Sequence, residues 1–294
     1  MTINRGLLTA AALPLLMLGA CARPGTADEA GSPGAAPVTE STTAGPDTIA
    51  LRVEYRGGFV PAESIPGRIP RFSVYADGRA LSEGPVPAIY PGPALPNLQV
   101  ITLSPEQVEK LTTEALAAGV KSGGDFGTPN VADIPSTRIS VVTAEGEQSV
   151  EVVALNEAAP DDTSLTAEQH AARKKLTEFL ASLDRLFAEA TSPAAKPYQP
   201  AALAVLAQPY QDTGDGAGGA AVAWPGPALP GPALTEQPKV DCLTVEGADK
   251  DAVWKLAEKA NARTPWESAG KKYQIVFRPL LPDETSCDSL KRQA

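Results

Sequence analysis

Residues 98–119 read LQVITLSPEQVEKLTTEALAAG and predict a short strand that leads directly into a helix. The apolar run 98–103 has the length of a strand, and Ser104 with Gln107 has the spacing of a capping box. Pro105 suits the first position of a helix. A strand followed at once by a capped amphipathic helix indicates a fold that mixes α and β elements.

Further strands are predicted on both sides of this segment, because apolar and polar residues alternate there. They cover residues 48–55, 72–76, 138–143 and 148–155, with tight turns expected at Asp77-Gly78 and Glu145-Gly146. A longer helix is expected from Thr166 to Ala190, with an apolar stripe that would cover a sheet. The expected fold class is therefore α+β, with mainly antiparallel sheets covered by helices.

One short pattern occurs twice in the chain. Tyr90 is followed by PGPALP, and the same six residues follow Trp224. A strand, a helix and another strand are expected after each copy, which predicts two related β-α-β halves, residues 70–155 and 200–281. Chance recurrence in a proline-rich chain is the alternative, and the local GPAL at 231–234 favours it.

The start of the chain has the pattern of a bacterial lipoprotein leader. Residues 7–18 are almost wholly apolar, too few to span a bilayer but suited to the core of a signal peptide. Leu18-Gly-Ala-Cys21 resembles a lipobox, the cleavage site of such lipoproteins. The resemblance implies that Cys21 becomes the mature N-terminus and carries acyl chains such as palmitate. An ordinary secretory signal with an incidental cysteine is the alternative.

The composition changes after Cys21. The next 26 residues are rich in Ala, Gly, Pro, Ser, Thr and acids, and they cannot bury enough apolar surface to fold. As a flexible coil they would reach roughly 30 Å. The predicted organisation is a signal peptide 1–20, a disordered tether 21–47, an N-terminal α+β sub-domain 48–190 and a C-terminal α+β sub-domain 191–294. The protein is expected on the extracytoplasmic face of the bacterial cell membrane, held there by lipid on Cys21.

Two further cysteines, Cys242 and Cys287, bracket most of the second β-α-β unit. The compartment outside the cytoplasmic membrane permits disulfides, so a structural disulfide between them is expected. Two free thiols or a redox pair are the alternatives, although the Cys-x-x-Cys spacing typical of redox pairs is absent.

Charge and composition argue against several classes of function. The net charge is −10, which disfavours nucleic acid as a partner, and three cysteines with one histidine do not make a common zinc framework. His170 is interpreted as a surface residue in the first turns of a helix. The glycine-rich stretch 214–219 formally fits a dinucleotide fingerprint, but Trp224-Pro225 follows where a helix would have to begin. No catalytic residue, metal ligand or cofactor is therefore assigned.

Three segments nevertheless look more specified than an ordinary surface, namely residues 55–59, 125–135 and 278–284. Structural locking of loops and a binding edge are their two interpretations. In the last of them Arg278 could pair locally with Asp283 or Glu284, and such a pair would be worth about 0–1 kcal/mol if exposed. Asp125-Phe126-Gly127 matches a kinase tripeptide without the other kinase motifs, and Asp212 with Asp215 lacks the spacing of an EF-hand.

Three segments of the body also resemble a known domain. FSVYADGR at 72–79, LSPEQ at 103–107 and ADIPSTRISV at 132–141 together resemble an uncharacterised domain of bacterial secreted proteins and lipoproteins. The likeness spans roughly residues 48–186 and excludes the PGPALP insertion and the second half. That family has no assigned activity, so the resemblance implies no functional residue.

These observations favour a non-catalytic, membrane-anchored protein that binds or scaffolds in the cell envelope, with an unknown protein or envelope partner. A carboxylate-dependent envelope hydrolase is one alternative, and it requires two carboxylates that converge in a pocket. A solute-binding lipoprotein of a transporter is the other, and it requires a deep cleft between two lobes.

The lipoprotein hypothesis makes a direct prediction. Cys21→Ser removes the only thiol in the leader that can be acylated, so the variant should lose its lipid and leave the membrane fraction. Fractionation of cells and mass spectrometry of the N-terminal peptide measure both effects. Continued acylation of the variant would refute the hypothesis.

Overall fold

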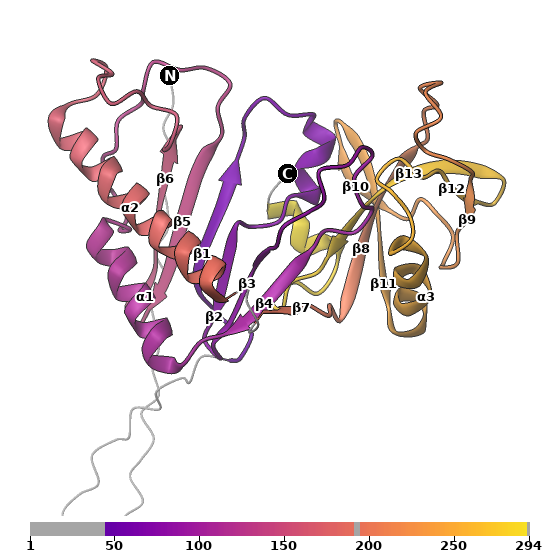
Figure 1. Cartoon of the computed structure of the whole chain (residues 1–294), viewed down its shortest axis with the longest axis horizontal. Helices are drawn as coiled ribbons and strands as arrows, with labels where there is room; N and C mark the ends of the chain where they lie inside the picture. The colour runs from indigo at the N-terminus through magenta and orange to yellow at the C-terminus, as the bar shows by residue number, and fades with distance from the viewer. Residues whose placement is uncertain (1–44, 191–194, 293–294) are drawn as a thin grey trace, which may run out of the picture. The chain divides into compact units, whose positions relative to one another are not determined.

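Two β-sheets organise the chain (Figure 1). The structure, a computed structural model, describes residues 45–190 and 195–292, which belong to one compact unit. It contains 24% helix and 31% strand, and nearly all strand pairs are antiparallel, so the predicted α+β class is confirmed. The predicted signal peptide 1–20, Cys21 and most of the tether lie outside the described residues. Residues 45–47, the last of the expected tether, form a turn that leads into the first strand.

The first sheet has seven strands in the order β6-β5-β1-β2-β3-β4-β7. The β2–β3 turn is the predicted Asp77-Gly78, and Gly78 has a φ of 88°. A Cβ at Gly78 would lie 2.2 Å from the carbonyl oxygen of Leu103, so only glycine fits there. The strands are β1 (Ile49–Arg56), β2 (Phe72–Tyr75), β3 (Arg79–Glu83), β4 (Leu98–Thr102), β5 (Ser136–Thr143), β6 (Gly146–Val153) and β7 (Lys196–Pro197).

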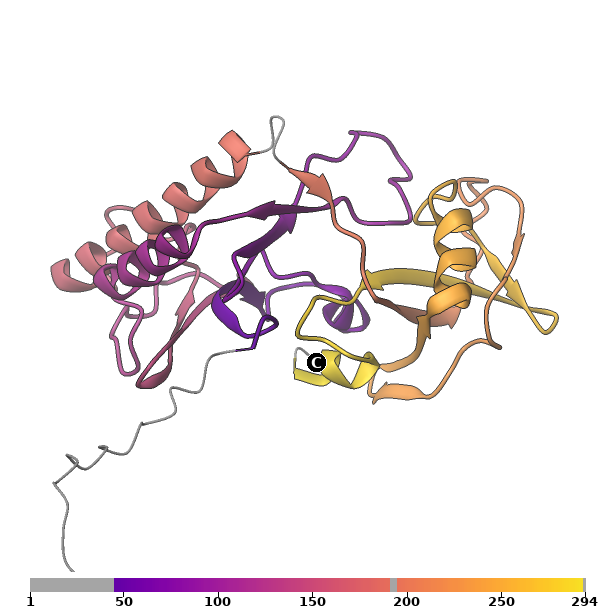
Figure 2. The same ribbon diagram turned by 90° about the horizontal axis from the view of Figure 1, so that it is seen from below.

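Helices α1 (Pro105–Ala118) and α2 (Ala167–Ala190) lie side by side over one face of this sheet (Figures 1 and 2). Both begin with a capping box, and the one at α1 was predicted. The backbone N–H of Gln107 donates to Ser104 Oγ over 3.3 Å, and the N–H of Ser104 donates to the Gln107 side chain over 2.8 Å. Thr166 and Gln169 form the same reciprocal pair. Within the described ranges, neither these helices nor any other is long and apolar enough to cross a membrane.

The main core lies between this sheet and its helices. Alternate residues of the strands point into it, as the period of a strand requires, and they meet the apolar stripes of α1 and α2. The buried residues include Leu51, Val53, Val74, Ile139, Val141, Leu111, Ala115, Leu176, Phe179, Leu180 and Leu183. The stripe predicted for the long helix is therefore core.

The second sheet has six strands in the order β10-β11-β8-β13-β12-β9. Helix α3 (Gly247–Ala257) packs on it through Val253 and Ala257. Two short 3₁₀ segments, η1 (Ala62–Gly67) and η2 (Cys287–Arg292), lie outside the sheets. The strands are β8 (Ala202–Pro209), β9 (Val222–Ala223), β10 (Ala233–Glu236), β11 (Lys239–Glu246), β12 (Trp266–Ser268) and β13 (Lys271–Pro279).

The two halves share a strand-helix-strand unit but differ in the sheet around it. α1 connects the parallel strands β4 and β5, while α3 and the short strand β12 connect the parallel strands β11 and β13. Three strands separate β4 from β5, whereas β8 alone separates β11 from β13. β2 runs parallel to β5, whereas β8 runs antiparallel to β13. The strand upstream of each unit therefore does not correspond, so duplication stays a prediction limited to the crossover itself.

The predicted boundary near residue 190 divides the two sheets only in part. β7 lies beyond it yet pairs with β4 of the first sheet. Both PGPALP copies also pack in the core of the second sheet, through Leu95 of the first copy and Leu229 of the second. Chain segments thus cross between the sheets in both directions, which ties their packing together.

Cys242 on β11 and Cys287 at the start of η2 form the expected disulfide, with Cα atoms 6.0 Å apart. Both residues belong to a small buried cluster with Leu234 and Leu290. The disulfide closes a 45-residue loop and fixes the end of the chain against the second sheet.

Loss of this disulfide should destabilise the protein. Replacement of Cys242 and Cys287 by alanine together removes the loop constraint, which the chain-entropy model values at about 4 kcal/mol as an upper figure. Urea denaturation of the variant, with the reduced native chain as control, measures the change. Two alkylatable thiols in the unreduced native chain would contradict the expectation.

Candidate functional site

The face of the first sheet opposite its helices is covered by the C-terminal segment 280–284. Residues on this face alternate with core residues, so Arg52, Ser73 and Tyr75 point toward that segment. Leu281 packs there against Tyr75, together with other side chains of the sheet. An outward face that would otherwise be solvated is therefore buried.

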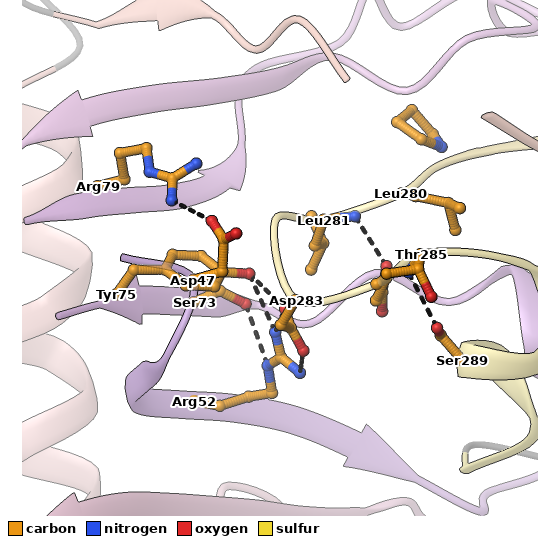
Figure 3. A network of polar contacts seen from close by, with 12 residues as sticks. Asp47, Arg52, Ser73, Tyr75, Arg79, Leu280, Leu281, Asp283, Thr285 and Ser289 are labelled. Carbon is orange, nitrogen blue, oxygen red and sulfur yellow. Dashed lines mark hydrogen bonds and ion pairs between the residues drawn. The ribbon is translucent and has the colours of Figure 1, made fainter. Parts of the chain in front are cut away.

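Asp283 is the centre of this contact (Figure 3). The guanidinium of Arg52 donates to both of its carboxylate oxygens, over 2.7 and 3.0 Å, and the Tyr75 hydroxyl donates to one of them over 2.6 Å. Arg52 also donates from Nε to Ser73 Oγ over 3.3 Å. A bidentate arginine–carboxylate pair of this kind fixes direction as well as distance.

A second ion pair lies next to the first. Arg278 Nη2 donates to Glu284 Oε1 over 2.9 Å, and both side chains are almost fully buried, at 0% and 1% exposure. Arg278 also donates from Nε to the carbonyl of Arg68 over 3.0 Å, and the other oxygen of Glu284 accepts the N–H of Leu281. We call Arg52, Tyr75, Arg278, Asp283 and Glu284 the junction cluster.

The structure selects one of the two partners considered for Arg278. It pairs with Glu284, and the pair is buried. Asp283 pairs instead with Arg52, 231 residues away in the sequence. The physical reason is that the 280–284 turn packs between the two sheets, so neither carboxylate reaches water freely.

The environment of the junction cluster shifts its pKa values. Desolvation by itself would raise the pKa of Asp283, but hydrogen bonds and charge from Arg52 and the Tyr75 hydroxyl outweigh it and hold that pKa below its ordinary value. Burial lowers the pKa of Arg278 and raises that of Tyr75. Since these groups bind one another closely, the cluster has the chemistry of a structural clamp rather than of a proton-transfer site.

A cleft of about 710 Å³ opens between the two sheets, beside this cluster. It lies where β1 and β3 end and β5 begins, and β13 forms its opposite wall. Its lining is mostly apolar and rich in proline. The lining residues are Glu54, Tyr55, Gly67, Arg68, Ile69, Pro70, Glu83, Val86, Pro87, Ile89, Gly92, Pro93, Ala94, Leu95, Pro96, Pro135, Ala262, Ile275, Val276 and Phe277.

The proline-rich connection 84–97 between β3 and β4 forms one side of the cleft. It is fixed at its base, where the N–H of Gly84 donates to the carbonyl of Asn97 over 2.7 Å. Its far part is fixed to the second sheet, because the N–H of Ala94 donates to Ala260 and that of Ala262 donates to Gly92. Val86 and Ile89 remain 59% and 63% exposed on it. The first PGPALP copy therefore holds one wall of the cleft in place.

Three charged side chains line the cleft. Glu54 is held by Arg56, which donates twice to Oε1 over 2.7 and 3.1 Å, and Arg138 lies 3.8 Å from the same oxygen. Burial raises the pKa of Glu83 against an opposing effect of Arg278. Arg68 forms no ion pair among the residues that the structure describes, and its Nη1 is buried without a hydrogen-bond partner.

The other candidate residues have structural roles. His170 is half-buried, and its Nε2 lies 2.9 Å from the carbonyl oxygen of Asp162. Asp125 accepts hydrogen bonds from Gly127 N–H and from Gln169, while Phe126 is core. The sequence interpretation of loop locking holds for that segment.

The stretch 214–219 is a loop without a following helix, as predicted. Asp212 and Asp215 each accept a backbone N–H within it, from Gly214 and Ala217. Across residues 45–190 and 195–292, no group of three or more His, Cys, Asp or Glu side chains is placed to hold a metal ion.

Sequence reasoning singled out Arg278, Asp283 and Glu284 at the junction, but it missed Arg52 and the charged residues of the cleft. Arg52 looked like an ordinary outward residue of an alternating strand, because nothing in β1 reveals that segment 280–284 covers it. Arg68 lies in the short connection after η1 and Glu83 is the last residue of β3, and neither belongs to a motif. For the cleft, the available signal was the recurrence of PGPALP, which marks a fixed wall.

The Arg52–Asp283 pair should contribute strongly to stability. Asp283→Asn leaves the Arg52 charge buried without its partner, and this should lower the free energy of unfolding by about 3–5 kcal/mol. Asp184→Asn breaks the more exposed Arg71–Asp184 pair and should cost only about 0–1 kcal/mol. Equal losses in urea denaturation of the two variants would contradict the role of the junction cluster.

The Arg52–Asp283 pair also determines whether the stability of the fold rises or falls in acid. The native pKa of Asp283 is lowered. Its contribution to the free energy of unfolding is therefore complete above the ordinary aspartate pKa of about 3.9, and it is lost as the pH falls through the native pKa. The Asp283→Asn variant should therefore lose less stability than the native chain when the pH is lowered below about 4.

Comparison with known proteins identifies no relative of this chain. Scans against protein-family models, curated proteins and solved structures each return no match. The resemblance to a secreted-protein domain stays a prediction from residues 72–141.

Proposed function

We propose that this protein is a lipid-anchored, extracytoplasmic binding protein and that the cleft between its sheets is its ligand site. The observation that carries the proposal is the exposure of Val86 and Ile89, at 59% and 63%, on a fixed wall of an apolar cleft. Exposed apolar side chains around a concave site are typical of ligand contact. The volume of about 710 Å³ lies within the usual range for small-molecule sites.

The position of the cleft fits an anchor at Cys21. The chain enters β1 at Ile49, near Asp47, which pairs with Arg79 over 2.6 Å. Glu54 and Tyr55 line the cleft at the opposite end of the same strand. Eight residues of strand separate the two ends by about 25 Å. Lipid on Cys21 would therefore hold the protein at the membrane from the end remote from the cleft.

The two alternative functions, a hydrolase and a solute receptor of a transporter, have less support. A hydrolase needs two available carboxylates, but Glu54 is held by Arg56 and Arg138, which leaves Glu83 without a matching partner. A transporter's solute receptor closes two lobes around its ligand, but the junction cluster crosses between the sheets beside the cleft. These contacts oppose hinge closure and favour a preformed, non-catalytic binding site.

Photocrosslinking in living cells tests the proposal. Ile89 is replaced by the photoreactive p-benzoylphenylalanine in the full chain, and Val142, 38% exposed on β5 and outside the cleft, carries the same group in a control. An adduct of small-molecule mass should form at position 89 and not at position 142. Mass spectrometry of the two peptides measures it. No adduct at either position, or equal adducts at both, would overturn the proposal.

A further inference from the structure

Arg68 is unusual among the residues of the cleft, because its Nη1 is buried without a hydrogen-bond partner among the described residues. It lies between η1 and β2, is half-buried, and lines a cavity whose other walls are mostly proline and aliphatic side chains. Its main-chain carbonyl accepts a hydrogen bond from Arg278, so its backbone is fixed to the junction cluster. Its side chain forms no hydrogen bond or ion pair within the part of the chain that the structure describes.

We propose, building on the proposed function, that the cleft binds a single-chain amphiphilic carboxylate, with the guanidinium of Arg68 holding the carboxylate and the apolar walls holding the chain. A partly desolvated cation without a partner is costly, and a bound anion offsets that cost. The planar guanidinium matches a carboxylate in a bidentate geometry.

The walls favour a hydrocarbon chain over a peptide. Pro70, Pro87, Pro93, Pro96 and Pro135 contribute surface without a backbone N–H. A peptide that entered would lose hydrogen bonds to water and find few donors to replace them, which is unfavourable. A hydrocarbon chain has no such requirement and gains from burial against the same surface.

The charge balance favours a carboxylate over a phosphate ester. One carboxylate carries a single charge, which Arg68 alone neutralises. A phosphate monoester carries about −1.5 to −2, and the excess would remain in the same cleft as Glu83. Glu54 adds little to this balance, because Arg56 and Arg138 compensate it.

A defined probe tests the inference. The full chain in phosphatidylcholine nanodiscs is irradiated with a diazirine-bearing hexadecanoic acid or with the corresponding alcohol. Labelled peptides are quantified by mass spectrometry and normalised to labelled lipid. The acid should label segments 83–96 and 275–277 about tenfold more than the alcohol, since charge-assisted hydrogen bonds distinguish the two probes.

Matched variants test whether Arg68 causes the preference for the acid over the alcohol. Arg68→Gln should reduce the acid-to-alcohol ratio to about one, whereas Arg185→Gln, which removes an exposed charge on α2 outside the cleft, should leave it unchanged. Glu83→Gln should raise labelling by the acid, because it removes a like charge from the cleft. Arg68→Gln removes no hydrogen bond of the side chain, so its urea unfolding midpoint should not fall.

The outcomes separate the two proposals. Equal labelling of the cleft by acid and alcohol, unaffected by Arg68→Gln, overturns the carboxylate inference and leaves the binding cleft in place. The carboxylate inference is also overturned, and the binding cleft is kept, if neither probe labels the cleft while position 89 still forms a small adduct in cells. A lower unfolding midpoint for Arg68→Gln would also overturn it, since Arg68 would then be a structural residue.

Discussion

The bidentate pair between Arg52 and Asp283 is the interaction on which the arrangement of the two sheets depends. It joins the middle of β1 to the turn after β13, and Tyr75 completes the hydrogen bonding of the same carboxylate. Beside it, Arg278 and Glu284 compensate each other at almost zero exposure. Buried ion pairs of this kind add little net energy when complete, but breaking one is costly, so they select one arrangement over others.

The cleft follows from that arrangement. With segment 280–284 fixed against the first sheet, β13 lies opposite the ends of β1 and β3, and the connection 84–97 spans from one sheet to the other. Its prolines restrict the backbone and supply apolar surface without donors. The result is a rigid wall next to Arg68, a cation that has no partner among the described residues. Rigidity of the site limits the loss of conformational freedom when a ligand binds.

Local signals predicted much of the fold and little of the site. The capping boxes at Ser104 and Thr166, the turn at Asp77-Gly78 and the Cys242–Cys287 disulfide follow from short-range chemistry or from compartment, and the structure has them all. The partners of Arg52 and the neighbours of Arg68 are set by contacts between residues far apart in the chain. No periodicity in β1 distinguishes a solvated arginine from one that a distant turn will cover.

The place of Asp283 and Cys287 near the end of the chain has a consequence for the order of events during synthesis. Arg52 leaves the ribosome 231 residues before the carboxylate that compensates it, so this contact between the sheets cannot form until Asp283 has been synthesised. The Cys242–Cys287 disulfide then secures this late segment against the second sheet.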